Sequence, residues 1–182
     1  MNNKHSFLKL VGHVLLSRPT EIMLFTLALF ALNGCANNAI FEATKRGDLE
    51  QVKAIVAENP KIVNSGNGGT ESPLCIAVEA DQKDVAEFLI AHGADVNYNV
   101  INIGAPLHIA AFHGYKDMAI LLLANGADVN LHTGTDTYTY NNGQVKRIGD
   151  MTPLHMAVTH GHMDVAELLR QHGGVDAGYD NN

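Results

Sequence analysis

The chain has 182 residues, enough for one domain of ordinary size, and 46% of them are hydrophobic, which excludes a disordered chain without a core. Its 12 lysines and arginines and 19 aspartates and glutamates give a net charge of −7 at pH 7. A negative surface repels phosphate backbones, so the composition argues against nucleic acid and favours a basic protein as the partner.

Residues 1–34 differ in composition from the rest, and we expect them to be a signal peptide. A basic stretch precedes a charge-free run, 22–32, which is shorter than the roughly 20 apolar residues of a membrane-spanning helix. The run ends in Leu-Asn-Gly-Cys35, which resembles the lipobox of bacterial lipoproteins. That resemblance implies cleavage before Cys35 and a lipid on it, with the protein in the periplasm at the outer membrane. The alternatives are an uncleaved membrane anchor and a cytosolic chain with an apolar N-terminal tail.

A self-similar unit fills most of residues 35–182 and is the strongest pattern in the sequence. Three segments begin at Pro73, Pro106 and Pro153 with Pro-Leu-x-x-Ala and end in a glycine-containing turn. The first two prolines are 33 residues apart, and the next interval of 47 equals one unit plus an insertion of 14. A degenerate copy of the unit begins at Ile40. The expected units are about 38–69, 70–102, 103–149 and 150–178.

The unit resembles the ankyrin repeat, which has about 33 residues and the motif Thr-Pro-Leu-His-x-Ala. The resemblance implies an all-α solenoid of about four helix-turn-helix repeats that binds another protein. The local chemistry agrees, because the hydroxyl of Ser72 or Thr152 can cap a helix and the following proline suits its first turn. Such short helix pairs cannot bury their own apolar faces, so neighbouring units must stack.

Departures from the motif predict the surroundings of single residues. Ala105 replaces the capping threonine, and Cys75 replaces the histidine at an inward position, where we expect a buried thiol. Arg170 stands where the other units have an aliphatic residue, which predicts that the fourth unit is the terminal one. The residues expected to be sandwiched between repeats are Ile55, Leu89, Leu122 and Leu169.

Ten histidines suggest a metal site, but the repeat accounts for most of them. His108 and His155 are the histidines of the motif, which in ankyrin repeats make structural hydrogen bonds. No Cys and His quartet has zinc spacing, and no motif for a serine hydrolase, metalloprotease or phosphate loop occurs. We therefore expect no catalytic residue, metal or cofactor. An enzyme or metal carrier built on the histidines is the rival interpretation.

The insertion predicts a β-hairpin-like finger between the third and fourth repeats. In its segment 137–140 threonine and tyrosine alternate, which favours a strand, and Asn142-Gly143 is a favoured two-residue hairpin turn. An idle surface loop is the alternative. The candidate partner-binding residues are Tyr138 and Tyr140 in the finger and Glu79, Ile109, Phe112, Met156 and Thr159 on the first helices.

For function, the sequence predicts a non-catalytic protein-binding module that is lipid-anchored in the bacterial periplasm. Small ankyrin lipoproteins of this kind are similar to immunity proteins that neutralise toxins, such as phospholipases, delivered into the periplasm. That resemblance implies a membrane-acting toxin or enzyme as the partner. The alternatives are an accessory factor for a periplasmic enzyme such as a catalase, and a membrane-anchored scaffold.

Overall fold

The computed structural model describes residues 39–66, 71–100, 103–133, 136–139, 145–148 and 151–177. Residues 1–38 form a separate unit from 39–182. The predictions of a signal peptide at 1–34 and a lipid on Cys35 therefore fall outside the described residues. Within those residues, no helix combines the length and the apolar character needed to cross a bilayer.

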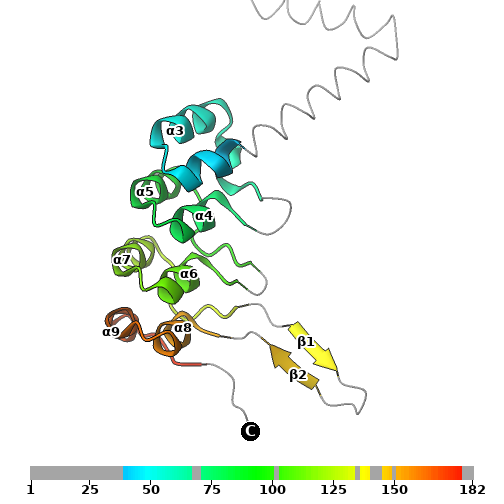
Figure 1. Cartoon of the computed structure of the whole chain (residues 1–182), viewed down its shortest axis with the longest axis vertical. Coiled ribbons are helices and arrows are strands. Elements are labelled where there is room, and N and C mark those ends of the chain that lie inside the picture. Colours follow the sequence, from blue (N-terminus) through cyan, green and yellow to red (C-terminus); the bar gives the residue numbers. More distant parts are fainter. Residues whose placement is uncertain are drawn as a thin grey trace, which may run out of the picture. The chain divides into compact units, whose positions relative to one another are not determined.

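Four pairs of helices follow one another in the part of the chain that the structure describes (Figure 1). The first pair is a helix at 39–46 and α3 (Leu49–Glu58), which a short 3-10 helix, η1 (Pro60–Asn64), follows. The other pairs are α4 (Pro73–Glu79) with α5 (Lys83–Ala91), α6 (Pro106–His113) with α7 (Lys116–Ala124), and α8 (Pro153–Thr159) with α9 (Met163–Gln171). The first helices form one row and the second helices another. The described chain is thus the all-α solenoid that the repeats predict.

The first helices begin as the motif predicts. The hydroxyl oxygens of Ser72 and Thr152 each accept a hydrogen bond from the backbone N–H three residues later, at 3.3 Å. Ala105 has no such group, and the ring of His108 satisfies a different backbone donor at this helix start. Its Nδ1 accepts from the N–H of Ala105 at 3.1 Å.

A residue in the left-handed region ends the first helix of every pair. Three of these residues are glycines, and the fourth is Asp81, whose φ is +52°. At Gly114 the neighbouring repeat also requires glycine, because a β-carbon there would collide with the ring of His162. The turn between the two helices of one repeat is therefore packed directly against the next repeat.

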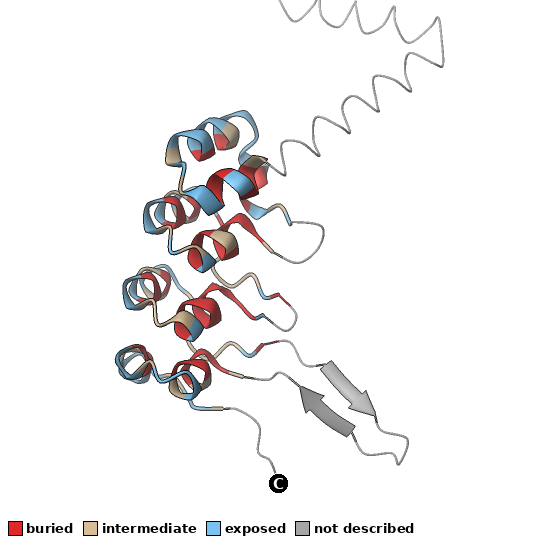
Figure 2. Cartoon of the chain, viewed as in Figure 1, coloured by how far each residue is buried: buried red, intermediate tan, exposed pale blue. Residues whose placement is uncertain are grey.

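The core lies between the helices, where the buried residues face one another (Figure 2). Leu89, Leu122 and Leu169 are fully buried, as expected. The expectation for Ile55 is wrong, because Ile55 is only half-buried while its neighbour Val56 is buried. The turn residues of the first two repeats are 34 rather than 33 apart. Counting from the turn therefore gives Ile55, whereas counting 33 residues back from Leu89 gives Val56.

A ladder of asparagine side chains connects each repeat to the next. Each amide group donates to a glycine carbonyl of the following repeat and accepts from a backbone N–H two residues beyond that glycine. The bonds are 2.8–3.1 Å long and join Asn64 to Gly93 and Asp95, Asn97 to Gly126 and Asp128, and Asn130 to Gly173 and Val175. The corresponding position of the fourth repeat is Ala177, which has no side-chain amide to continue the ladder, and Arg170 is exposed.

Two short strands lie between the third and fourth repeats. They are β1 (Asp136–Thr139) and β2 (Val145–Ile148), paired antiparallel with Thr139 opposite Val145. Next to them, the N–H of Thr133 donates to the carbonyl of Met151, and the N–H of Met151 donates to Oγ1 of Thr133, both at 3.0 Å. These bonds hold the two ends of the insertion together. The predicted turn at Asn142-Gly143 lies outside the described residues.

Candidate partner-binding surface at the turns

One side of the stack is formed by the last turn of each first helix and the one or two residues that follow it. We call this surface the turn edge. Its members are Lys45, Arg46, Glu79, Asp81, Phe112, His113, Thr159 and His160. All of them are exposed except His113, whose side chain is 29% exposed. Because each repeat contributes one turn, the side chains of neighbouring repeats meet along this edge.

An aromatic ring lies at the centre of the turn edge. Phe112 is 43% exposed, and its ring centroid is 4.9 Å from that of His113, edge to face, and 4.2 Å from that of His160 in the next repeat. His113 also pairs with an acid, since its Nε2 lies 3.2 Å from Oε2 of Glu79 in the preceding repeat. Three repeats therefore meet around one exposed phenyl ring.

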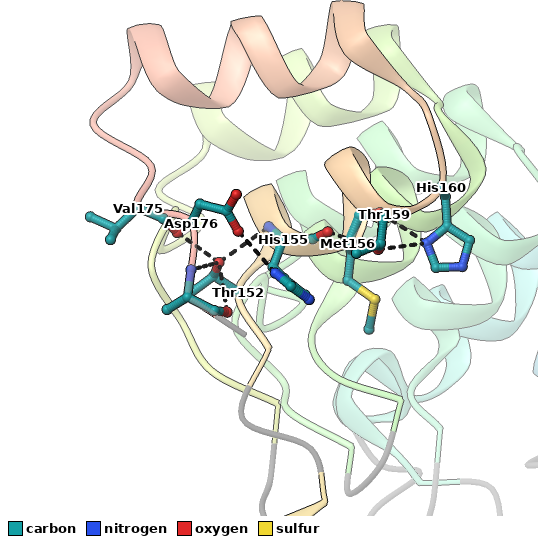
Figure 3. A network of polar contacts seen from close by, with 8 residues as sticks. Thr152, His155, Met156, Thr159, His160, Val175 and Asp176 are labelled. Carbon is teal, nitrogen blue, oxygen red and sulfur yellow. Dashed lines mark hydrogen bonds and ion pairs between the residues drawn. The ribbon is translucent and has the colours of Figure 1, made fainter. Parts of the chain in front are cut away.

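The side chains around this ring are held in place by the helix ends. Nδ1–H of His160 donates to the carbonyl of Met156 at 2.9 Å, and the Thr159 hydroxyl oxygen lies 2.8 Å from the carbonyl of His155 (Figure 3). On the other side, the ring of His113 stacks on Tyr115 with centroids 5.1 Å apart. The surface is therefore ordered before any partner arrives.

Two of the predicted contact residues do not belong to this surface. Ile109 is 5% exposed and Met156 is 7% exposed, so neither offers contact area to a partner. Both lie in the middle of helices of seven or eight residues that pack against a neighbouring first helix. Only the last turn of such a short helix reaches the surface, which is where Phe112 and Thr159 lie.

His108 belongs to the interior and binds the third repeat to the fourth. Its ring is fully buried, Nδ1 accepts from Ala105, and Nε2–H donates to the carbonyl of Met151 at 2.9 Å. Burial disfavours the charged imidazolium and lowers the pKa of His108 to about 4, against a smaller opposing effect of the bonds to backbone carbonyls. The ring is therefore neutral with its proton on Nε2.

Comparison with known families identifies this architecture. A family model described as ankyrin repeats (3 copies) matches residues 21–100 and 40–133, and one described as ankyrin repeat matches 149–182. The chain belongs to the ankyrin-repeat family. Ankyrin repeats are protein-binding modules and typically have no catalytic role, so this chain is a protein-binding module. The two matches leave out residues 134–148, which contain both strands of the insertion.

The second histidine of the ankyrin motif has a different role at the end of the stack. His155 carries its Nδ1 2.9 Å from a carboxylate oxygen of Asp176, and the Thr152 hydroxyl donates to the carbonyl of Val175 at 2.7 Å (Figure 3). These bonds fold the segment after α9 back onto the start of α8. Both motif histidines thus make structural hydrogen bonds, as the resemblance implies.

The single cysteine among the described residues is also structural. Cys75 is 1% exposed, and burial raises the pKa of its thiol. The hydroxyl of Ser72 donates to its Sγ at 3.4 Å. A thiol that is buried and kept protonated is a poor nucleophile. Across the described ranges, no group of three His, Cys, Asp or Glu side chains is placed to hold a metal ion.

The finger residues are placed only in part. Tyr138 lies in β1 opposite Lys146 of β2, whereas Tyr140 falls outside the described residues. Sequence reasoning missed His113, His160, Lys45 and Arg46 of the turn edge. The signal was available, since all four stand one or two residues before the glycine that ends the first helix of their repeat.

Proposed function

We propose that this ankyrin-repeat protein uses the turn edge and the finger to bind and inhibit a partner at the bacterial cell envelope. The observation that carries the proposal is the exposed ring of Phe112, which contacts the imidazoles of His113 and His160, with His113 in turn paired to Glu79. Exposed aromatic side chains with polar neighbours are the residues that dominate protein interfaces.

The order of this surface also supports binding. A partner that docks on mobile side chains must immobilise them, at a cost of about 0.5–1.5 kcal/mol for each. Here His160 is already fixed by the carbonyl of Met156, and His113 by Glu79 and Tyr115. Less of the binding free energy is therefore lost to ordering, which favours a tight and specific complex.

Lipid anchoring at Cys35 would restrict where that partner acts. Cys35 is four residues before the first described helix, and each residue of a chain spans at most about 3.5 Å. A lipid on Cys35 would thus keep the start of the first repeat within roughly 14 Å of the membrane surface. This supports a partner that acts on membranes, and we propose an immunity role against a secreted toxin such as a phospholipase. The lipid would lie in the outer membrane, facing the periplasm.

The change in the partner's activity on binding distinguishes an inhibitor from the main alternative, an accessory factor. An inhibitor lowers the activity of the captured protein, whereas an accessory factor for a periplasmic enzyme such as a catalase maintains or raises it. Both share the same binding surface. The measurement is the activity of the partner with and without an equal amount of this chain.

The test of the surface is capture of partners from envelope extracts, with the lipid-anchored full chain as bait. Phe112→Ala should reduce recovery of the specific partner by at least tenfold, equivalent to about 1.4 kcal/mol. Met163→Ala is the matched control, because Met163 is 58% exposed on α9 and is not a member of the turn edge. Equal capture by the two variants would reject the turn edge as the binding surface.

A further inference from the structure

The chemistry of the turn edge changes from one repeat to the next in a fixed order. The first repeat presents two cations, the second two carboxylates, the third an aromatic ring with an imidazole, and the fourth a hydroxyl with an imidazole. The corresponding residues are Lys45 and Arg46, Glu79 and Asp81, Phe112 and His113, and Thr159 and His160. A partner that runs along the stack therefore meets positive charge, negative charge and an aromatic ring in turn.

Contacts between neighbouring repeats show that this order in sequence is also the order in space. At the first junction, a β-carbon on Gly47 would collide with the side chain of Gln82. At the second junction, His113 pairs with Glu79, and at the third, the ring of His160 packs on Phe112. The four turns thus form one continuous edge.

The acid and the ring at the centre of the edge both contact the same side chain, that of His113. His113 links them, since it is 3.2 Å from Oε2 of Glu79 and edge to face with Phe112. The Glu79 side chain remains 60% exposed, and a carboxylate can accept hydrogen bonds at both oxygens. A planar cation that bonds a carboxylate and stacks on an aromatic face is a guanidinium.

The cations of the first repeat favour a carboxylate beside that guanidinium. Lys45 and Arg46 are both exposed, and Arg46 donates one bond, at 2.9 Å, to Gln51. An arginine has five N–H donors, so most of its donors remain for a ligand. An acidic group of the partner would be attracted to this repeat and repelled by Glu79 and Asp81 in the next one.

We propose that the partner presents an arginine to Glu79 and Phe112 and an acidic residue to Lys45 and Arg46. This inference rests on the proposed function, because it names the chemistry of the protein that docks on the turn edge. Packed helices are about 8–10 Å apart, and an extended chain advances about 3.3 Å per residue. Because alternate side chains of an extended chain point the same way, the partner segment would carry the acid two or four residues from the arginine.

The probe is a library of displayed random peptides, selected on the immobilised full-length chain in detergent micelles. Selected peptides should be enriched over the unselected library in arginine with an acidic residue two or four positions away. Selection on Glu79→Lys should exchange the arginine for an acidic residue, because the charge it meets is reversed. A pool without arginine enrichment, or an unchanged preference on Glu79→Lys, overturns the inference.

The affinity of one selected peptide, measured by fluorescence anisotropy, then separates the contributions of Glu79 and Phe112 to binding. Glu79→Gln and Phe112→Ala should each weaken binding at least tenfold. Glu87→Gln should leave it unchanged, because Glu87 is an exposed acid of the same repeat on the second helix, α5. Circular dichroism confirms that each variant is folded. Weakening by Glu87→Gln equal to that by Glu79→Gln would show a general effect of charge and refute a specific arginine site.

Partner capture distinguishes a failure of this inference from a failure of the proposed function. If capture from envelope extracts depends on Phe112 but tolerates Glu79→Lys, the turn edge is the binding surface, and the inference that the partner presents an arginine to Glu79 is wrong. If capture tolerates both substitutions, the proposed function of the edge fails as well. Capture that is lost with Glu79→Lys and retained with Glu87→Lys supports both.

Discussion

The buried histidine that links the third and fourth repeats should make the stability of the protein depend on pH. His108 is fully buried, with one ring nitrogen accepting from the N–H of Ala105 and the other donating to the carbonyl of Met151. A proton added to Nδ1 would remove the acceptor and place a charge in the core. Burial, which disfavours this charge, lowers the pKa of His108 from 6.5 to about 4.

The sign of this pH dependence follows from how many protons the folded and unfolded chains bind. Between pH 6.5 and pH 4 the unfolded chain binds a proton at residue 108 that the folded chain does not, so the free energy of unfolding falls as the pH falls. A pKa lowered from 6.5 to about 4 corresponds to about 3 kcal/mol when the loss is complete, with about 2 kcal/mol lost by pH 5. This is a large part of the stability of an ordinary domain, which is about 5–15 kcal/mol.

Urea unfolding followed by circular dichroism measures this effect at about pH 7.5 and about pH 5. Other groups also titrate in this range, so the informative quantity is the difference between wild type and His108→Gln. The variant should lose about 2 kcal/mol less on acidification. His155→Gln is the matched control, since His155 holds the same motif position but its ring reaches Asp176. An identical acid sensitivity in wild type and His108→Gln would refute the reasoning.

Three further predictions concern the core, the anchor and the finger. Leu122→Ala should lower the free energy of unfolding in urea by about 2–5 kcal/mol, because Leu122 is fully buried between repeats; a loss below about 0.5 kcal/mol would contradict that packing. Cys35→Ala should abolish lipid labelling and normal leader cleavage, and unchanged labelling and mass would disprove the lipoprotein assignment. Shortening residues 135–147 to an ordinary turn should leave the melting temperature nearly unchanged but weaken partner binding in calorimetry at least tenfold, as should joint replacement of Tyr138 and Tyr140 by alanine; equal binding would make the finger idle.

The fold could be predicted from the sequence because one local solution repeats along it. The second, third and fourth units share a proline, an apolar stripe and a left-handed turn residue at fixed spacing, and two of them also carry a capping hydroxyl. The error at Ile55 shows where this reasoning fails. The first two turns are 34 residues apart rather than 33, and a shift of one position on a helix turns a side chain by about 100° away from the core. The choice between two registers depends on packing between repeats, which the pattern does not specify.

The candidate surface was harder to predict, because it depends on how far each helix extends beyond its neighbours. Glu79, Phe112 and Thr159 were expected at the surface and are exposed. Ile109 and Met156 were expected there and are buried. They are three residues before Phe112 and Thr159, so one turn of helix separates the buried residues from the exposed ones. A sequence shows this boundary only when the length of the packed helix is known.

The asparagine ladder explains why the insertion is tolerated between the third and fourth repeats. Asn130 precedes the insertion and still bonds Gly173 and Val175, although 43 residues rather than 29 separate it from its glycine. Thr133 and Met151 close the ends of the added segment with two hydrogen bonds, and the ring of His108 donates a further hydrogen bond to the carbonyl of Met151. Once the ends are closed, the length of the loop has little effect on the stack, since doubling it costs only about 0.6 kcal/mol.

The same helix that secures this closure also presents the candidate contact surface. His108 and Phe112 are one helical turn apart on α6, a helix of eight residues. At a rise of about 1.5 Å per residue, only about 6 Å along the axis separates the buried ring from the exposed one. A loss of the bond between His108 and Met151 would therefore disturb both the closure of the insertion by Thr133 and Met151 and the packing of His160 on Phe112. If the partner uses both surfaces, its affinity should fall on acidification along with the stability of the third junction, and His108→Gln should weaken binding without any contact to the partner.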